Sequence, residues 1–331
     1  MSPNTTCRLN RSRQSVMRNS TITTFILLGL TDDPQLQVLL FIFLLLTYML
    51  SVTGNLTIIT LTFVDSHLKV PMYFFLQNFS FLEVSFTSVC IPRFLYNIAM
   101  GDKVITYKSC VIQVFLTNLF AVSEFFLFAA MSYDHYVAIC KPLHYVTIMS
   151  KSVCNFLIIC CWTAGLCIII PQFNMFLKVE FCASNIIDHF VCDAVPLVKI
   201  ACSDTRLLEE TVIICAVLTL IMTLPWVVLS YAYIIRTIFR FPSVQQRKKA
   251  FSTCSSHMIV VSITYGTCIF IYINPAAKDK VTINKVVSLL ISSFSPTLNP
   301  FIYTLRNNQV KKAFKDSIKR IEFLLNNRNS I

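Results

Sequence analysis

Residues 38–64 read VLLFIFLLLTYMLSVTGNLTIITLTFV, and this stretch decides the fold class. It contains no charged residue, and it exceeds the ~20 apolar residues that cross a bilayer core of about 30 Å at 1.5 Å per residue. Six further stretches of at least that length follow, at roughly 71–97, 107–139, 155–178, 207–240, 252–274 and 283–305. None shows the alternation of period two that is typical of a transmembrane barrel. The sequence therefore predicts an all-α fold, a bundle of seven transmembrane helices.

The composition agrees with a chain that lies mostly in lipid. Apolar residues make up 55% of the sequence and charged residues only 13%, about half the charged fraction of a typical soluble domain. The net charge of +12 could indicate nucleic acid, but the lysines and arginines lie in short connectors and a tail rather than on one basic domain with interleaved aromatics. Nucleic-acid binding is therefore excluded as a function.

Three segments follow from the positions of the spans. Residues 1–37 are expected to form an extracellular glycosylated N-terminus, because they contain three sequons, at Asn4, Asn10 and Asn19. Residues 38–305 are the expected seven-transmembrane-helix domain, and residues 306–331 a cytoplasmic tail. No cleavable signal peptide precedes the first span, so we expect that helix to be its own membrane anchor.

The tail has a helical pattern of its own. Val310, Phe314, Ile318, Ile321 and Leu325 recur at spacings of three and four, whereas the basic residues fall elsewhere around the helix, namely Lys311, Lys312, Lys315, Lys319 and Arg320. This pattern predicts a short amphipathic helix on an anionic cytoplasmic leaflet. The alternative is a frayed basic tail.

Four cysteines form a pattern around one connector. Cys182, Cys192 and Cys202 lie at ten-residue intervals between the fourth and fifth spans, and Cys110 stands near the start of the third. On an oxidising extracellular face, two disulfides would fasten this long loop to a helix end and close the loop on itself. The cysteine spacing alone leaves all three pairings open.

A run at the end of the third span identifies a family. Residues 131–140 read MSYDHYVAIC, and this run resembles the MAYDRYVAIC signature of the olfactory branch of rhodopsin-like G-protein-coupled receptors. Further similarity follows in order along the chain, at Gly54-Asn55, Pro71-Met72-Tyr73-Phe74-Phe75-Leu76, Ser230-Tyr231, Lys249-Ala250-Phe251-Ser252-Thr253-Cys254-Ser255-Ser256-His257 and Pro296-Thr297-Leu298-Asn299-Pro300-Phe301-Ile302-Tyr303. The resemblance therefore covers the whole bundle.

The resemblance implies a function and residues that perform it. A receptor of this kind binds a small volatile odorant in an apolar pocket and activates a heterotrimeric G protein of the olfactory stimulatory type, which raises cyclic AMP. It lies in the plasma membrane with its N-terminus outside, and it is not an enzyme. The disulfides implied are Cys110–Cys192 and Cys182–Cys202. The implied pocket residues are Thr117, Asn118, Val122, Thr219, Tyr265, Ile269 and Tyr272, and those of the coupling switch are Asp134, His135, Tyr136, Tyr231, Asn299, Pro300 and Tyr303.

Some of these residues have plain structural interpretations. Val122 and Ile269 can equally be helix-packing residues. Pro300 removes one backbone hydrogen bond and predicts a kink after Asn299. That kink is either static or, as the resemblance favours, the point about which the helix moves on activation.

One residue departs from the family signature. His135 stands where the family has arginine, and histidine is shorter, carries no fixed fork of donors and titrates near neutrality. We expect weaker control of the resting state and altered basal signalling. The alternative is that neighbouring contacts make His135 an adequate substitute.

Two acids lie deep in the spans. Glu83 and Glu124 are costly in hydrocarbon unless they are paired, protonated or bound to a cation. The resemblance places them around a buried ion site, so we expect Na⁺ or a shared proton there, with a hydrogen-bonded structural pair as the alternative. No other cofactor is expected.

The same acids suggest a rival function, a transporter or channel with a proton or cation relay. Against it, no half of the chain repeats the other, and only five glycines are available for the broken helices that such sites use. An intramembrane enzyme is disfavoured too, since no metal cluster or Ser/Lys pair stands out in the sequence and His257 alone is interpreted as structural.

Overall fold

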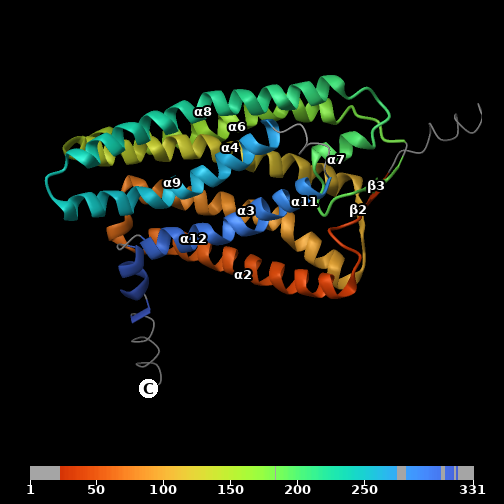
Figure 1. Cartoon of the computed structure of the whole chain (residues 1–331), viewed down its shortest axis with the longest axis horizontal. Coiled ribbons are helices and arrows are strands. Elements are labelled where there is room, and N and C mark those ends of the chain that lie inside the picture. Colours follow the sequence, from red (N-terminus) through yellow and green to blue (C-terminus); the bar gives the residue numbers. More distant parts are fainter. Residues whose placement is uncertain (1–22, 183, 274–280, 307–309, 317, 320–331) are drawn as a thin grey trace, which may run out of the picture.

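The computed structural model describes residues 23–182, 184–273, 281–306, 310–316, 318 and 319. Long helices run side by side through it between two ends (Figure 1). They are α2 (Pro34–Val64), α3 (Pro71–Met100), α4 (Tyr107–Cys140), α6 (Lys151–Phe176), α8 (Arg206–Arg240) and α9 (Val244–Ile273), followed by α11 (Val281–Leu289), a π-helical turn η3 (Leu290–Phe294) and α12 (Ser295–Arg306). The seven predicted spans fall on these elements, with α11, η3 and α12 together forming the seventh. The predicted helix bundle is confirmed.

The helices have the length and surface of membrane spans. Within the described residues, five helices are long and apolar enough to cross a bilayer, and α9 makes a sixth if its two bent halves count as one span. In the seventh stretch, the π-helical turn η3 joins α11 to α12 without a break in the helical backbone. Large apolar side chains cover the outer faces of the bundle, among them Leu39, Phe63, Trp226 and Phe239, as expected for a lipid-facing surface.

Local sequence signals set several helix ends. The side chain of Asp33 accepts hydrogen bonds from the backbone N–H groups of Gln35 and Leu36, and Pro34 occupies the first helical position of α2. Helix α3 also opens on a proline, and it ends at Gly101, whose positive φ of 67° suits a residue without a side chain. The helices therefore begin and end where polar caps, proline or glycine allow it.

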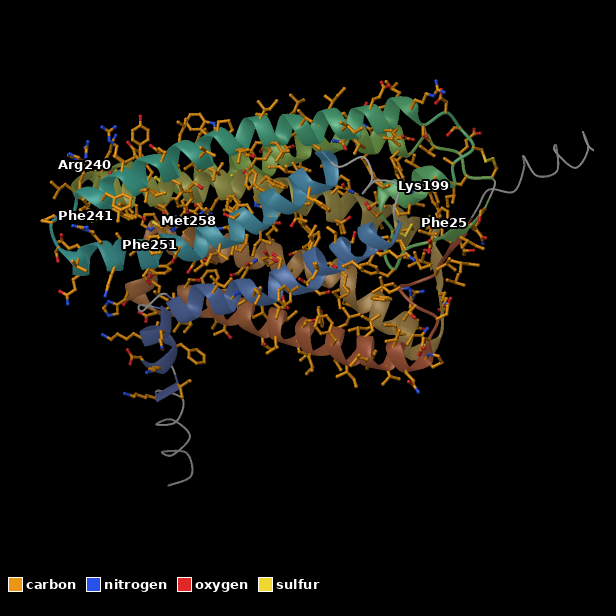
Figure 2. All side chains as sticks on the ribbon, viewed as in Figure 1. Phe25, Lys199, Arg240, Phe241, Phe251 and Met258 are labelled. Carbon is orange, nitrogen blue, oxygen red and sulfur yellow. A yellow bond between two sulfur atoms is a disulfide. The ribbon has the colours of Figure 1, made fainter. Side chains whose placement is uncertain are left out.

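One end of the bundle carries a small sheet and both disulfides, and is called the disulfide end. Strand β1 (Thr24–Leu27) pairs antiparallel with β2 (Val104–Thr106) and parallel with β3 (Ile186–Ile187), giving the order β2-β1-β3. Phe25 and Leu27 of β1 are buried among side chains of α4, α6 and the long loop, and Figure 2 shows Phe25 at this end together with Lys199 of the short helix α7 (Ala194–Lys199). The sequence did not predict these strands, because so short a strand forms only through partners distant in the chain.

The opposite end carries the remaining connectors. It includes the 3-10 turns η1 (Ser66–Leu68) and η2 (Pro142–His144), the short helix α5 (Tyr145–Ile148) and the connection from α8 to α9, where Figure 2 labels Arg240 and Phe241. Residues 310–316 are helical and turn away from the bundle axis (Figure 1). Val310 and Ala313 are buried, whereas Phe314 and Ile318 are exposed beside exposed lysines. The C-terminal helix is amphipathic, with Val310 packed inward, while Arg320, Ile321 and Leu325 lie outside the described residues.

Two glycines allow helices to pack closely. A side chain at Gly54 of α2 would place its Cβ 2.8 Å from Cβ of Pro300 on α12, and one at Gly165 of α6 would place it 2.3 Å from Oγ of Ser123 on α4. Such small residues are how membrane helices approach each other. At Gly266 of α9, by contrast, an added Cβ meets nothing within 4 Å.

The glycine contacts predict a matched pair of stability effects. Gly165→Ala should destabilise the receptor by about 1–3 kcal/mol, because the new methyl group overlaps Ser123. Gly266→Ala should be neutral or stabilising, because alanine is favoured over glycine inside a helix. Thermal unfolding of detergent-solubilised protein measures both, and equal melting temperatures for the two variants would contradict the packing described for α4 and α6.

Candidate functional site

Helix α4 carries predicted functional residues along its whole length. Cys110 lies in its first turns, Thr117 and Asn118 follow about two turns later, Glu124 is near the middle, and Asp134 and His135 lie near its end. Since residues on a helix rise by about 1.5 Å each, one rigid element connects the disulfide end with the opposite end. The neighbouring helices determine what each of these side chains touches.

The predicted pocket residues lie on α4, α8 and α9. Thr117, Asn118, Val122 and Ile269 are half-buried, and Thr219 and Tyr265 are buried. The Tyr265 ring of α9 packs edge-on against Phe125 of α4, with centroids 4.9 Å apart. The structure therefore brings α4 and α9 together at this level. The side chain of Tyr272 lies outside the described residues.

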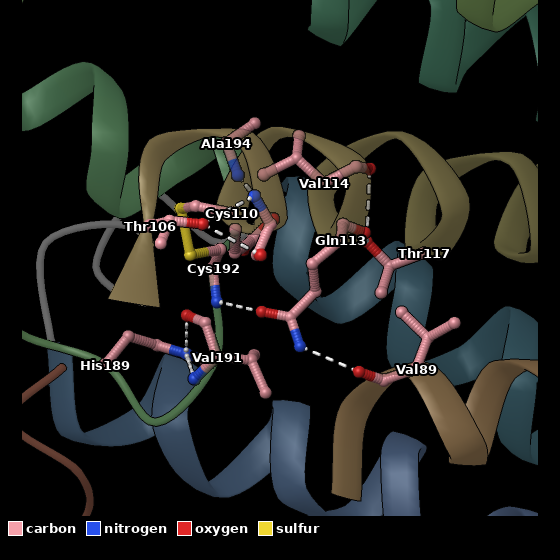
Figure 3. Close-up of a disulfide and its surroundings, with 12 residues drawn as sticks. Val89, Thr106, Cys110, Gln113, Val114, Thr117, His189, Val191, Cys192 and Ala194 are labelled. Carbon is pink, nitrogen blue, oxygen red and sulfur yellow. Dashed lines mark hydrogen bonds between the residues drawn. A yellow bond between two sulfur atoms is a disulfide. The ribbon is translucent and has the colours of Figure 1, made fainter. Parts of the chain in front are cut away.

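A disulfide and a glutamine hold the long loop against the bundle (Figure 3). Cys110 and Cys192 are joined with Cα atoms 5.4 Å apart, and a second bond joins Cys182 and Cys202, which is the pairing implied by the resemblance. Gln113 lies one turn after Cys110. Its Oε1 accepts from the backbone N–H of Cys192 at 2.9 Å, and its Nε2 donates to the carbonyl of Val89 at 2.8 Å. One buried side chain thus connects α3, α4 and the loop.

Of the two predicted acids, only Glu83 makes a hydrogen bond with a described residue. Nδ2 of Asn299 donates to Oε1 of Glu83 at 2.6 Å, which joins α12 to α3 inside the bundle. The half-buried side chain of Glu124 makes no hydrogen bond with the described residues, but it is close enough to Glu83 for their charges to interact. The two acids were predicted to lie together, but Asn299 was not predicted as the hydrogen-bond partner of Glu83.

Two buried hydroxyl groups on α3 and η3 lack a hydrogen-bond partner within the part of the chain that the structure describes. Among the described residues, the buried hydroxyl oxygens of Ser80 and Ser293 have no hydrogen-bond partner. Ser80 lies one turn before Glu83, and Ser293 belongs to η3, which packs against α3. Oxygen donors of this kind are the ligands that hard cations prefer. The described residues contain no cluster of three or more His, Cys, Asp or Glu side chains that could hold a metal ion.

At the opposite end, Asp134 bonds to a connector and not to a neighbouring span. The hydroxyl of Tyr145 donates to Oδ1 of Asp134 at 2.9 Å and accepts from the backbone N–H of Met72 at 3.1 Å. Burial raises the pKa of Tyr145, so its hydroxyl remains a donor at neutral pH. Three elements, α3, α4 and α5, therefore meet at one phenol oxygen.

His135 lies in a column of three rings. It stacks on His257 of α9, with centroids 5.2 Å apart and an interplanar angle of 14°, and His257 stacks in turn on Tyr231 of α8. Nδ1 of His257 lies 2.5 Å from the Tyr231 hydroxyl, and Nδ1 of His135 donates to the carbonyl of Met131 at 2.6 Å. Both imidazoles are buried. The residue that replaces the family's arginine thus holds α9 by ring stacking.

The structure describes two further residues of the predicted switch, Tyr136 and Pro300. Tyr136 is half-buried and tilts against Tyr233 of α8, with centroids 5.9 Å apart. Pro300 lies inside α12. The side chain of Tyr303 and the sequons at Asn4, Asn10 and Asn19 lie outside the described residues.

Three residues that were not predicted as part of the site contact predicted residues or hold the loop in place. Gln113 anchors the loop, Tyr145 meets Asp134, and His257 meets His135. A polar residue inside an apolar span was the available signal for Gln113 and His257. Tyr145 carried no such signal, because it lies in a connector and reaches Asp134 only in the folded chain.

Comparisons with known proteins agree with this architecture. The family model described as "Olfactory receptor" matches residues 44–321. The human protein "Olfactory receptor 6C2" is 72% identical over 309 residues, which cover 93% of this chain and 99% of that protein, and "Olfactory receptor 6C68", also human, is 68% identical over 308 residues, covering 93% and 99%. The crystal structure of squid rhodopsin superposes with a TM-score of 0.65 at 15% identity, over 88% of this chain and 87% of that one.

The rhodopsin likeness supports the fold alone, whereas the family model and the relatives cover most of the sequence. The family is one of receptors, not enzymes. This chain belongs to the olfactory receptor family of G-protein-coupled receptors.

Proposed function

We propose that the chain binds a small, mostly apolar odorant inside the bundle and then activates a heterotrimeric G protein of the olfactory stimulatory type. This proposal rests on helix α4, which extends from the predicted pocket residues to the predicted coupling residues. Half-buried Thr117 and Asn118 lie toward its disulfide end, and Asp134 and His135 lie at the other. A ligand that favours one arrangement of α4, α8 and α9 shifts the population at the coupling end.

The orientation proposed with this function places the disulfide end and the N-terminus outside the plasma membrane. Two disulfides lie at that end, and disulfides persist on oxidising faces. The sequons at Asn4, Asn10 and Asn19 belong to the same side of the first span. The exposed lysines of the C-terminal helix would then face the anionic cytoplasmic leaflet.

The proposed function predicts an odorant-dependent rise in cyclic AMP in cells that contain this chain and an olfactory G protein. Asn118→Leu should weaken the response to an active odorant by about tenfold, because the pocket loses a hydrogen-bonding group in an apolar surrounding. Leu39→Ala, on the lipid-facing surface of α2, is the control. The proposal would be contradicted if the receptor reached the cell surface but responded to no odorant in a broad panel. It would also be contradicted if the protein conducted ions in reconstituted vesicles.

The ring column predicts an effect on basal signalling. His135→Arg removes the stack on His257 and introduces a longer, permanently charged side chain into a buried place, so basal cyclic AMP should change by several-fold. His135→Phe, which keeps a flat ring but makes no hydrogen bond, should stay closer to wild type if stacking holds α9. Basal cyclic AMP at equal surface expression measures both, and three indistinguishable levels would reject a role for this position in coupling.

The buried acids predict sensitivity to sodium. We propose that Glu83 holds Na⁺ or a proton with help from Glu124, so raising Na⁺ should lower basal activity in membranes, and Glu83→Gln should abolish that dependence. Gln keeps a partner for Asn299, so loss of packing alone does not produce the result. If sodium does not change the basal activity of the wild type while Glu83→Gln does change it, sodium binding is ruled out. A shared proton or a hydrogen-bonded structural pair then explains the two acids.

A further inference from the structure

The long loop buries a histidine where it packs against the bundle at the disulfide end. His189 lies between β3 and α7 with only 2% of its surface exposed, and its ring stacks on that of Phe190 with centroids 4.7 Å apart. Phe190 and Val191 are buried in an apolar cluster with residues of α2 and α3, and Leu289 of α11 packs against the same cluster. The loop segment 188–192 therefore holds against three of the helices.

The two ring nitrogens of His189 have different surroundings (Figure 3). Nδ1 lies 3.2 Å from the backbone nitrogen of Val191 and 3.1 Å from its carbonyl oxygen, so it can accept from the first or donate to the second. Nε2 is buried and has no hydrogen-bond partner among the described residues. A neutral imidazole therefore fits this place, whereas an imidazolium would bury a charged Nε2–H without an acceptor.

Charged groups of the loop and of α11 surround the ring. The carboxylates of Asp193 and Asp188 are close enough to His189 for their charges to favour a proton on it, and the ammonium group of Lys285 on α11 disfavours that proton. Both carboxylates already have partners. Asp193 accepts from the backbone N–H of Ala194 at 2.7 Å, and Oδ1 of Asp188 lies 2.5 Å from Nζ of Lys285.

The balance of these effects keeps His189 neutral at neutral pH. Burial lowers the pKa of His189 from its ordinary value, and the charge of Lys285 adds to this effect, although Asp193 and Asp188 oppose it. The elements beside α2 and α3 add further titratable or charged groups near this cluster, namely Asp32 with its ion-pair partner Lys103, and the Cys90 thiol.

We propose that His189 makes the packing of this loop segment depend on the pH outside the cell, so that acid releases residues 188–192 from the bundle. At neutral pH the ring is uncharged and stays buried. A conformation in which the segment lifts and water reaches Nε2 binds a proton more tightly, so acid shifts the population towards it. The inference goes beyond the proposed function, and it rests on the proposed orientation only in placing this end outside the cell.

Thermal unfolding of the full receptor in detergent tests the proton linkage without an odorant. Because the pKa of His189 is lower in the folded protein than in an unfolded chain, its contribution to stability is complete above about pH 6.5 and is lost as the pH falls below that value. From about pH 7.5 to about pH 5.5, the melting temperature of the wild type should therefore fall by about 2–4 °C more than that of His189→Phe. Phenylalanine keeps a ring to stack on Phe190 but cannot take up a proton.

Two further variants separate proton uptake from poor folding. His189→Gln keeps an uncharged hydrogen-bonding group beside Val191, and it should also remove the extra loss of stability in acid. His67→Phe replaces an exposed histidine of η1, and it should keep the pH dependence of the wild type. His135 and His257 are present in all four proteins, so their titration cancels in the comparison.

Intact cells test the release of the loop, because acidifying only the medium reaches His189 and not the ring column at the opposite end. For an uncharged odorant, the concentration that gives half-maximal cyclic AMP should rise at least about threefold when the medium is acidified from about pH 7.4 to about pH 6.0. For His189→Phe that concentration should stay constant.

The outcomes distinguish this inference from the proposed function. Equal acid sensitivity of the wild type and both His189 variants, in detergent or in cells, would overturn the role of His189. A wild type that shows the predicted loss of stability in acid but responds to no odorant at either pH would support the proton linkage and contradict the proposed function.

Discussion

In a hydrocarbon environment, every polar group of the backbone must find its partner within the protein, and this constraint governs the bundle. It makes the spans helical, and it also turns serine, threonine and asparagine side chains back onto their own helices, as at Thr117 and Thr219. Other polar side chains bond to a neighbouring helix instead. Asn299 with Glu83, and Tyr231 with His257, are therefore links that position whole helices.

These links lie at different depths along the bundle. The Gln113 amide fixes the loop at the disulfide end, the bond between Asn299 and Glu83 joins α12 to α3 in the middle, and the His135 and His257 rings close the opposite end. Since α4 carries or borders all three levels, a change where a ligand binds has a rigid element through which it can act on the coupling end. Stacked rings lack the fork of donors that an arginine provides, so we expect α9 to move more readily here than it would with arginine in place of His135.

The sequence could predict the spans because their length and lack of charge are local properties, and it could predict the disulfide pairing and the coupling motif through resemblance to a family. It could not predict contacts that depend on distant parts of the chain. Strand β1 needs β2 and β3 to exist, and Tyr145 reaches Asp134 only after α5 folds against α4. The acids were recognised as unusual, yet the partner of Glu83 came from the seventh span, more than two hundred residues away.

We propose that the stack of His135 on His257 holds the coupling end closed. The direct measurement is the separation of these two rings in an experimental structure of the receptor bound to an odorant and its G protein. In that complex we expect α9 to lie further outward, with the two rings no longer stacked at the 5.2 Å found here. A G-protein-bound receptor in which the two imidazoles remain stacked at that distance would contradict it.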